Sequence, residues 1–169
     1  RFYNNIFVKY WPELKNEGSD DAGNDKQLPG TWYFDGYPTY EEWIQRFDLD
    51  AARPDMRKLE AWHFDHLPVW AAGNAYLAGA KAWCKETDKL VEAESPVRVE
   101  LKEKDGRYYL DTNLYEIIGD FRGSVITSDT LGRAFEPDQR FEAPDGSTIV
   151  FDRDYFDNHR DPSALPGPF

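Results

Sequence analysis

An asparagine pair inside an apolar segment is the feature that most restricts how this chain folds. Residues 1–8 (RFYNNIFV) have the composition of a β-strand. Phe2, Ile6 and Val8 fall on one face at a period of two residues. Asparagine is depleted from ordinary strands, so the pair at positions 4 and 5 needs a setting in which its amides find partners. Stacked coils of a parallel β-solenoid provide one, because side-chain amides can hydrogen-bond to those in the coils above and below. The segment therefore predicts a solenoid strand.

Composition and charge restrict the partners. Of the 169 residues, 40% are hydrophobic and 16% are aromatic, which is enough apolar material for a core and argues against disorder. The formal net charge of −12 repels phosphate backbones and anionic lipids, so we expect neither nucleic acid nor a membrane as a partner. Abundant aromatic residues on an acidic protein suit a neutral ligand such as a sugar, although core packing accounts for most of them.

The first half of the chain predicts solenoid coils interrupted by loops and a short helix. Residues 16–26 (NEGSDDAGNDK) have the composition of an excursion loop, and residues 31–34 (TWYF) return to that of a strand. Thr39 and Glu42 form a capping box, in which each side chain satisfies a backbone amide of the other residue. An apolar stripe then predicts a helix over residues 40–47.

The second half predicts antiparallel strands joined by tight turns. Residues 97–101 and 108–110 alternate in polarity around Lys-Asp-Gly at 104–106, which predicts a hairpin. Residues 125–127 are a further strand candidate, and residues 144–147 (PDGS) are a turn flanked by Phe141 and by residues 149–151. Such short strands favour an antiparallel β-sandwich. We expect residues 1–90 to form terminal β-helix coils and residues 91–169 a sandwich-like segment that stops before its last strand.

No cofactor or metal is predicted. Cys84 is the only cysteine, which excludes an internal disulfide and a cysteine metal site, and we expect it to be a small buried residue. A single cysteine leaves the cellular compartment open, and the cytoplasm is our expectation.

His63 and His66 would share a face of a helix, but without a third ligand a polar turn beside a cleft is the better interpretation. Residues 152–157 (DRDYFD) lack the glycine and the bidentate glutamate of a calcium loop and fit a solvated strand end.

Eight short segments in a consistent order carry a resemblance to a known family. They are residues 1–7 (RFYNNIF), 74–76 (NAY), 79–80 (GA), 85–86 (KE), 88–91 (DKLV), 130–131 (TL), 144–147 (PDGS) and 152–155 (DRDY). Together they resemble the C-terminal part of the parallel-β-helix β-xylosidases of glycoside hydrolase family 120. The resemblance implies that a right-handed parallel β-helix precedes this chain in a larger protein. It also implies release of xylose from the non-reducing ends of xylo-oligosaccharides with retention of configuration.

The same resemblance locates the chemistry outside this chain. Retention requires two carboxyl groups roughly 5 Å apart. In the family both lie on coils that align before Arg1, so no residue here inherits a catalytic role. The expected partners are therefore the upstream β-helix and a xylo-oligosaccharide, and a homo-oligomer is compatible with the sequence.

One aromatic cluster is the candidate for sugar contact. In residues 32–37 (WYFDGY), Trp32 and Tyr33 offer flat apolar faces to a sugar ring, and the Asp35 carboxylate can accept hydrogen bonds from hydroxyl groups. The alternative is an aromatic plug that closes the end of the β-helix. For the whole chain, the alternative to a glycosidase segment is a non-catalytic carbohydrate-binding or structural β-module. A protein-interaction sandwich is a third alternative that no specific signal favours.

Overall fold

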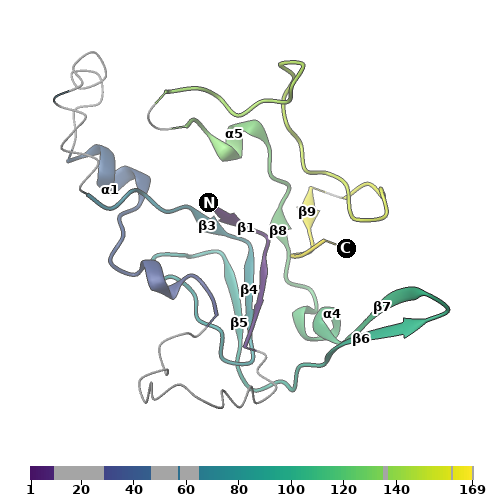
Figure 1. Ribbon diagram of the computed structural model, residues 1–169. Coiled ribbons are helices and arrows are strands. Elements are labelled where there is room, and N and C mark those ends of the chain that lie inside the picture. The colour runs from purple at the N-terminus through teal and green to yellow at the C-terminus, as the bar shows by residue number, and fades with distance from the viewer. Residues whose placement is uncertain (10–28, 47–56, 58–64, 135–136, 161, 169) are drawn as a thin grey trace, which may run out of the picture.

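Stacked parallel strands form the centre of the protein, and short helices and antiparallel pairs surround them (Figure 1). The computed structural model describes residues 1–9, 29–46, 57, 65–134, 137–160 and 162–168. Strand is the main regular structure, which confirms the mainly β prediction at this level. The elements are β1 (Phe2–Tyr3), β2 (Ile6–Val8), η1 (Trp32–Phe34), α1 (Tyr40–Ile44), β3 (Ala71–Ala72), β4 (Asn74–Leu77), β5 (Lys89–Glu92), β6 (Val99–Lys104), β7 (Arg107–Thr112), α4 (Leu114–Ile118), β8 (Gly123–Ser124), α5 (Ser128–Leu131) and β9 (Ser163–Ala164).

The parallel strands form two hydrogen-bonded ladders, whose strands follow one another in the sequence. Strands β2, β4 and β5 pair in parallel and in that order, with Ile6 opposite Ala75 and Ala75 opposite Leu90. Strands β1 and β3 pair in parallel as well. The predicted loop at residues 16–26 belongs to the first connection between these strands and lies outside the described residues. Parallel pairing of this kind requires long connections rather than hairpins.

The strand predicted over residues 1–8 is in fact two strands, because Asn4 interrupts it. Asn4 adopts a left-handed backbone conformation with φ of 55°, which no strand can continue. Its Nδ2 donates to the Ser124 carbonyl oxygen at 2.8 Å. A Cβ atom at Gly73 or Gly123 would lie 2.2 or 2.0 Å from Asn4 Oδ1, so both positions need glycine for Asn4 to occupy this place.

The second asparagine of the pair makes a side-chain amide contact between two segments that pair in parallel. Asn5 Nδ2 and the Asn5 backbone amide both donate to Asn74 Oδ1 at 2.9 Å. Asn74 Nδ2 in turn donates to the Phe2 carbonyl oxygen at 2.9 Å and to Glu86 Oε1 at 2.7 Å. The Asn74 side chain is fully buried and therefore joins three separate segments of the chain.

A buried polar network continues from this contact. The Tyr76 hydroxyl donates to Glu86 Oε2 at 2.6 Å and lies 2.7 Å from Thr31 Oγ1. Thr31 Oγ1 also accepts a hydrogen bond from the Trp83 backbone amide. Burial raises the pKa of the Glu86 carboxyl and of the Tyr76 hydroxyl, because the charged form of each group loses its hydration. We call the side chains of Asn5, Asn74, Glu86, Tyr76 and Thr31 the Glu86 network.

The apolar core lies between the parallel strands and α4. Its buried members are Ala75, Leu77, Leu114 and Ile118, and the partly buried residues packed on them include Ile6, Val8, Leu90, Val97, Val99 and Leu165. Ile6 and Val8 thus pack on apolar side chains as predicted, and the Phe2 ring lies 5.3 Å from the Phe34 ring. Among the described residues, no strand pairs with the second edge of β2.

The predicted capping box begins α1. Thr39 Oγ1 accepts from the Glu42 backbone amide, and Glu42 Oε2 accepts from the Thr39 backbone amide at 2.8 Å. The helix ends at Ile44, whereas residue 47 of the predicted stripe lies outside the described residues. Trp43 is completely buried and anchors the helix.

Replacing Thr39 by alanine should lower the free energy of unfolding by about 1 kcal/mol, because one amide at the helix start loses its acceptor. Urea denaturation of both proteins measures the difference. Thr39→Ser is the matched control, since it keeps the hydroxyl and should retain most of the stability. Equal losses in the two variants would show that the hydroxyl does not stabilise α1.

The strand predicted at residues 31–34 is wrong, because this segment forms the 3-10 helix η1. The backbone amides of Thr31 and Trp32 both donate to the Lys81 carbonyl oxygen, and the pairing with that segment stops there. The next amides, of Phe34 and Asp35, bond back to Thr31 and Trp32 within the same turn. Aromatic content alone therefore predicted a strand where the backbone forms a turn.

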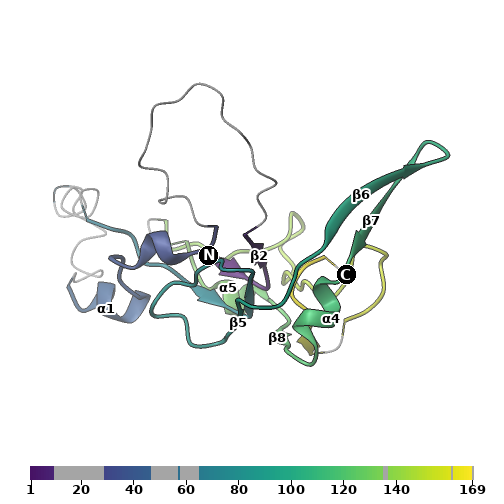
Figure 2. The same ribbon diagram turned by 90° about the horizontal axis from the view of Figure 1, so that it is seen from below.

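Antiparallel pairs dominate the second half, as predicted. β6 and β7 form the expected hairpin, with positive φ values at Asp105 and Gly106 in its turn, and the hairpin projects from the rest of the protein (Figure 2). β8 and β9 pair antiparallel, and the predicted turn at 144–147 is closed by a bridge between Glu142 and Thr148.

Antiparallel pairing is the part of the sandwich prediction that the structure confirms. The antiparallel ladders of the described residues are separate two-stranded sheets, so a sandwich stays a prediction. Residues 125–127 form no regular strand: they make single backbone hydrogen bonds and one bridge, from Thr127 to Val150, and the regular strand lies earlier, at β8. The division into residues 1–90 and 91–169 also stays a prediction.

No helix in the described part of the chain has the length and apolar character to cross a membrane.

Candidate functional site

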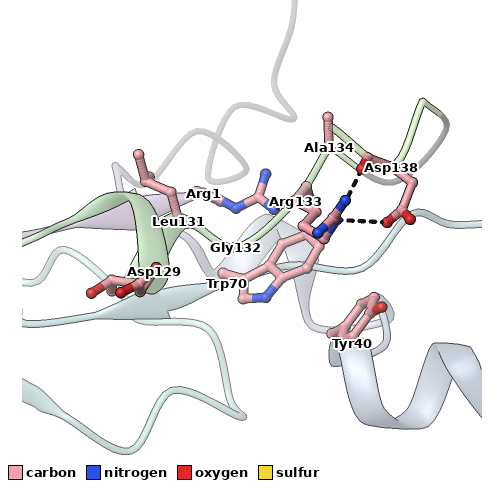
Figure 3. Close-up of a pocket in the computed structure, with 10 residues that line it drawn as sticks. Arg1, Tyr40, Trp70, Asp129, Leu131, Gly132, Arg133, Ala134 and Asp138 are labelled. Atoms are coloured by element: carbon pink, nitrogen blue, oxygen red, sulfur yellow. Dashed lines mark hydrogen bonds and ion pairs between the residues drawn. The ribbon is translucent and has the colours of Figure 1, made fainter. Parts of the chain in front are cut away.

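A cleft of about 300 Å³ lies where the first residue, α1, the segment before β3 and the loop after α5 come together (Figure 3). It is lined by Arg1, Tyr40, Trp70, Asp129, Thr130, Leu131, Gly132, Arg133, Ala134 and Asp138. We call it the Trp70 cleft. Its lining combines aromatic rings with charged groups of both signs, which is the mixture that binds polar ligands with apolar faces.

The aromatic side of the cleft is fixed by secondary structure on each side. The Trp70 carbonyl oxygen accepts a hydrogen bond from the Phe2 backbone amide, which holds the residue next to the β1–β3 pair. Tyr40 is the first residue of α1 and directly follows Thr39, the N-cap of the helix. The two rings stack with centroids 5.6 Å apart and an interplanar angle of 28°. Stacking of this kind keeps both rings in one orientation.

The charged side of the cleft is held by ion pairs. Arg133 Nε lies 3.0 Å from Asp138 Oδ1 and donates to the Asp138 carbonyl oxygen (Figure 3). Asp129 is paired with Arg140 from outside the lining, at 2.7 Å. Arg1 donates to the Arg133 carbonyl oxygen at 2.8 Å, and its guanidinium carbon lies 4.1 Å from the centre of the Trp70 ring. The polar groups are therefore ordered before any ligand arrives.

The residues that the sequence predicts for sugar contact lie elsewhere. Trp32, Tyr33 and Asp35 come together on and just after η1, and none of them lines the Trp70 cleft. The Tyr33 side chain is 72% exposed, while Asp35 Oδ1 is occupied by the Cys84 backbone amide at 2.8 Å. Exposure makes Tyr33 available to a ligand, and the contact between Phe34 and Phe2 also agrees with the aromatic plug. Their role in sugar binding stays a prediction.

Sequence reasoning missed the Trp70 cleft because its parts are far apart in the chain. Tyr40 was recognised only as a member of a helix stripe, and Trp70 and Asp129 carry no local motif. A contact between residues 1, 40, 70 and 129–138 becomes visible only in three dimensions.

The expected burial of Cys84 is wrong. Its side chain is exposed, because the backbone here is held at the surface by the bond from the Cys84 amide to Asp35. Partial desolvation and the Asp35 charge raise the pKa of the Cys84 thiol, so the thiolate is disfavoured and the residue is not an activated nucleophile.

Of the two motifs considered for metal binding, the histidine pair lies partly outside the described residues and residues 152–157 contain a turn. His63 lies outside the described residues, and the His66 ring stacks on Tyr37 at 4.0 Å between centroids. In residues 152–157, Asp154 Oδ1 accepts from the backbone amides of Phe156 and Asn158, as a turn carboxylate does. Within the described ranges, no group of three or more histidine, cysteine or acidic side chains is placed to hold a metal ion.

The fold and the cleft define a mainly β chain with parallel strands stacked in register beside an aromatic, charged cleft. Over its whole length this chain is similar to XylC, whose structure was solved in complex with xylose. The sequences are 28% identical, the TM-score is 0.73, and the match covers 100% of this chain and 24% of that one. The chain thus spans about a quarter of the length of this solved relative. No family model and no curated protein matches the sequence.

Proposed function

We propose that this chain is the C-terminal segment of a β-xylosidase-like glycoside hydrolase that releases xylose from xylo-oligosaccharides with retention. The observation that carries the proposal is the match to XylC, which extends over every residue of this chain at 28% identity. The xylose in that structure supports a pentose as the sugar. A xylo-oligosaccharide and the upstream part of the same protein are the proposed partners, and the cytoplasm is the proposed location.

The parallel strands support a β-helix in the rest of the protein. β2, β4 and β5 stack in register, and Asn5, just before β2, bonds to Asn74 of β4, as side-chain amides do in a solenoid. We propose that β2 continues the ladder of a right-handed parallel β-helix and that the antiparallel second half belongs to a sandwich docked beside it.

The proposed catalytic carboxylates lie upstream, and the acidic residues described here support this placement. Glu86 is 2% exposed, and both of its carboxylate oxygens already accept hydrogen bonds. Asp129 and Asp138 at the Trp70 cleft are each paired with an arginine. A retaining pair needs two carboxyl groups roughly 5 Å apart and open to the substrate. The burial of Glu86 and the arginine pairing of the two aspartates make these three groups poor candidates for such a pair.

The chain alone should therefore not hydrolyse nitrophenyl β-xyloside, whereas the full-length protein should hydrolyse it and release β-xylose first. Nitrophenol release measures turnover, and NMR of the first product measures its anomeric configuration. A folded sample of the chain, verified by its cooperative unfolding, is the control for a trivial loss of activity.

Two outcomes would contradict the proposal. Turnover by the chain that one acidic substitution abolishes would place the catalytic site within it. A full-length protein that binds xylan oligosaccharides and cleaves no xyloside would instead support the carbohydrate-binding module, which the exposed Tyr33 ring favours as the alternative.

A further inference from the structure

The charges at the Trp70 cleft do not balance. Arg133 is paired with Asp138, and Arg140 is paired with Asp129. Arg1 has no carboxylate partner in the described part of the chain, where it donates to a single carbonyl oxygen, that of Arg133. Its guanidinium also lies over the rings of Trp70 and Phe141, at 4.1 and 4.8 Å from their centres. In a chain of net charge −12, an arginine without a carboxylate at a cleft needs an explanation.

Stacking accounts for the position of the Arg1 guanidinium but leaves most of its donors unused. The aromatic rings attract the charge through their faces, whereas the N–H groups of a guanidinium lie in its plane. One Nη2 hydrogen goes to the Arg133 carbonyl oxygen. The planar fork is the geometry that binds a carboxylate through two parallel hydrogen bonds. The cleft thus presents a pre-oriented anion receptor beside two aromatic rings.

We propose that the Trp70 cleft binds a carboxylate-bearing saccharide unit, a uronic acid, with the carboxylate on Arg1 and the sugar ring against Trp70 and Tyr40. The saccharide part of this inference rests on the proposed glycosidase function, and the carboxylate part rests on Arg1. The ligand is then an acidic substituent or terminus of a xylo-oligosaccharide rather than a plain xylose unit.

The remaining charges of the cleft are compatible with such a ligand. Asp129 and Asp138 are each neutralised by an arginine, so they do not oppose an anion as free carboxylates would. The Asp129 carboxylate, whose Oδ1 takes the bond from Arg140, can accept a further hydrogen bond from a sugar hydroxyl group. The volume of about 300 Å³ is at the lower end for ligand pockets and suits one sugar unit.

The test compares methyl β-glucuronide with methyl β-glucoside, which differ only at C6, where a carboxylate replaces a hydroxymethyl group. The chain is prepared with a few residues before Arg1, so that the α-amino charge is removed from the cleft, and binding is followed by NMR titration at low and high salt. The glucuronide should bind about tenfold more tightly at low salt, and the preference should shrink as salt increases.

Three variants assign the effect to Arg1. Arg1→Gln should abolish the preference for the glucuronide while leaving weak glucoside binding, and Arg1→Lys should retain part of it because the charge remains without the fork. Arg98→Gln is the matched control, since Arg98 is an exposed arginine paired with Asp111 on the hairpin. It should change neither affinity.

Each contrary result has a distinct meaning. Equal affinity for the two glycosides would overturn the carboxylate assignment. Acetate that competes as well as the glucuronide would show an anion site without sugar recognition and would also overturn the proposal. Binding of neither glycoside would exclude the cleft as a sugar site, while the xyloside assay of the full-length protein tests the glycosidase function independently.

Discussion

Replacing Asn74 by alanine should lower the free energy of unfolding by about 4 kcal/mol. The substitution removes one side chain that holds the Asn5 amide, the Phe2 carbonyl oxygen and the Glu86 carboxylate at once. These groups stay buried without the partner that replaced water, and the buried Glu86 carboxylate contributes most of the loss. Urea denaturation followed by tryptophan fluorescence measures the change.

Asn158→Ala is the control for the same chemical change at an exposed site. In the part of the chain that the structure describes, the Asn158 side-chain amide bonds to the exposed Asp154 carboxylate, so water replaces it and the loss should stay below about 1 kcal/mol. Comparable losses in the two variants would show that the Glu86 network does not hold the parallel strands together.

The second prediction concerns pH and Glu86. Burial raises the pKa of this carboxyl above its ordinary value of 4.5, because desolvation outweighs the hydrogen bonds from Tyr76 and Asn74. The folded chain therefore keeps a proton at pH values where the unfolded chain has released it. This proton binding stabilises the fold fully below the unfolded pKa, and the contribution is lost as the pH rises through the folded pKa. Each unit of the shift corresponds to about 1.4 kcal/mol.

Glu86→Gln isolates this contribution. Glutamine can accept from Asn74 through its oxygen and donate to the Tyr76 hydroxyl, which then donates to Thr31, so every bond of the network survives. The stability of the wild type minus that of the variant should fall as the pH increases from 4.5, in urea titrations across the series. Carboxyls with lowered pKa values make stability rise with pH, but they contribute equally to both proteins and cancel in the difference. They are Glu42, Glu92, Asp145 and Asp154. A difference that does not vary with pH would contradict the assigned shift.

Local chemistry made part of this fold predictable from the sequence. The capping box at Thr39, the hairpin turn at Asp105 and Gly106, and the amide contact of Asn5 each depend on a few neighbouring residues or on one repeated side chain. The break at Asn4 was not predictable, because it depends on glycines at positions 73 and 123.

The candidate site was the least predictable part. The Trp70 cleft joins four segments, and no periodicity relates residue 1 to residue 70 or to residues 129–138. The strand predicted at residues 31–34 is wrong for a related reason, since aromatic content was clear there but the backbone forms a turn. Residue composition identifies which side chains suit a sugar, whereas tertiary packing decides which of them share a cleft.

The pairing of β2 with β4 also sets the order in which the protein assembles. Asn5 and Asn74 are 69 residues apart, whereas β4 and β5 are joined by the short segment 78–88. Closing the longer loop carries the larger entropic penalty and delays the contact. On the ribosome, the apolar segment at residues 1–8 emerges before β4 and keeps an edge without this partner until β4 has been synthesised. Slower translation of residues 9–70 would lengthen this exposure, and a holdase chaperone during expression would raise the soluble yield.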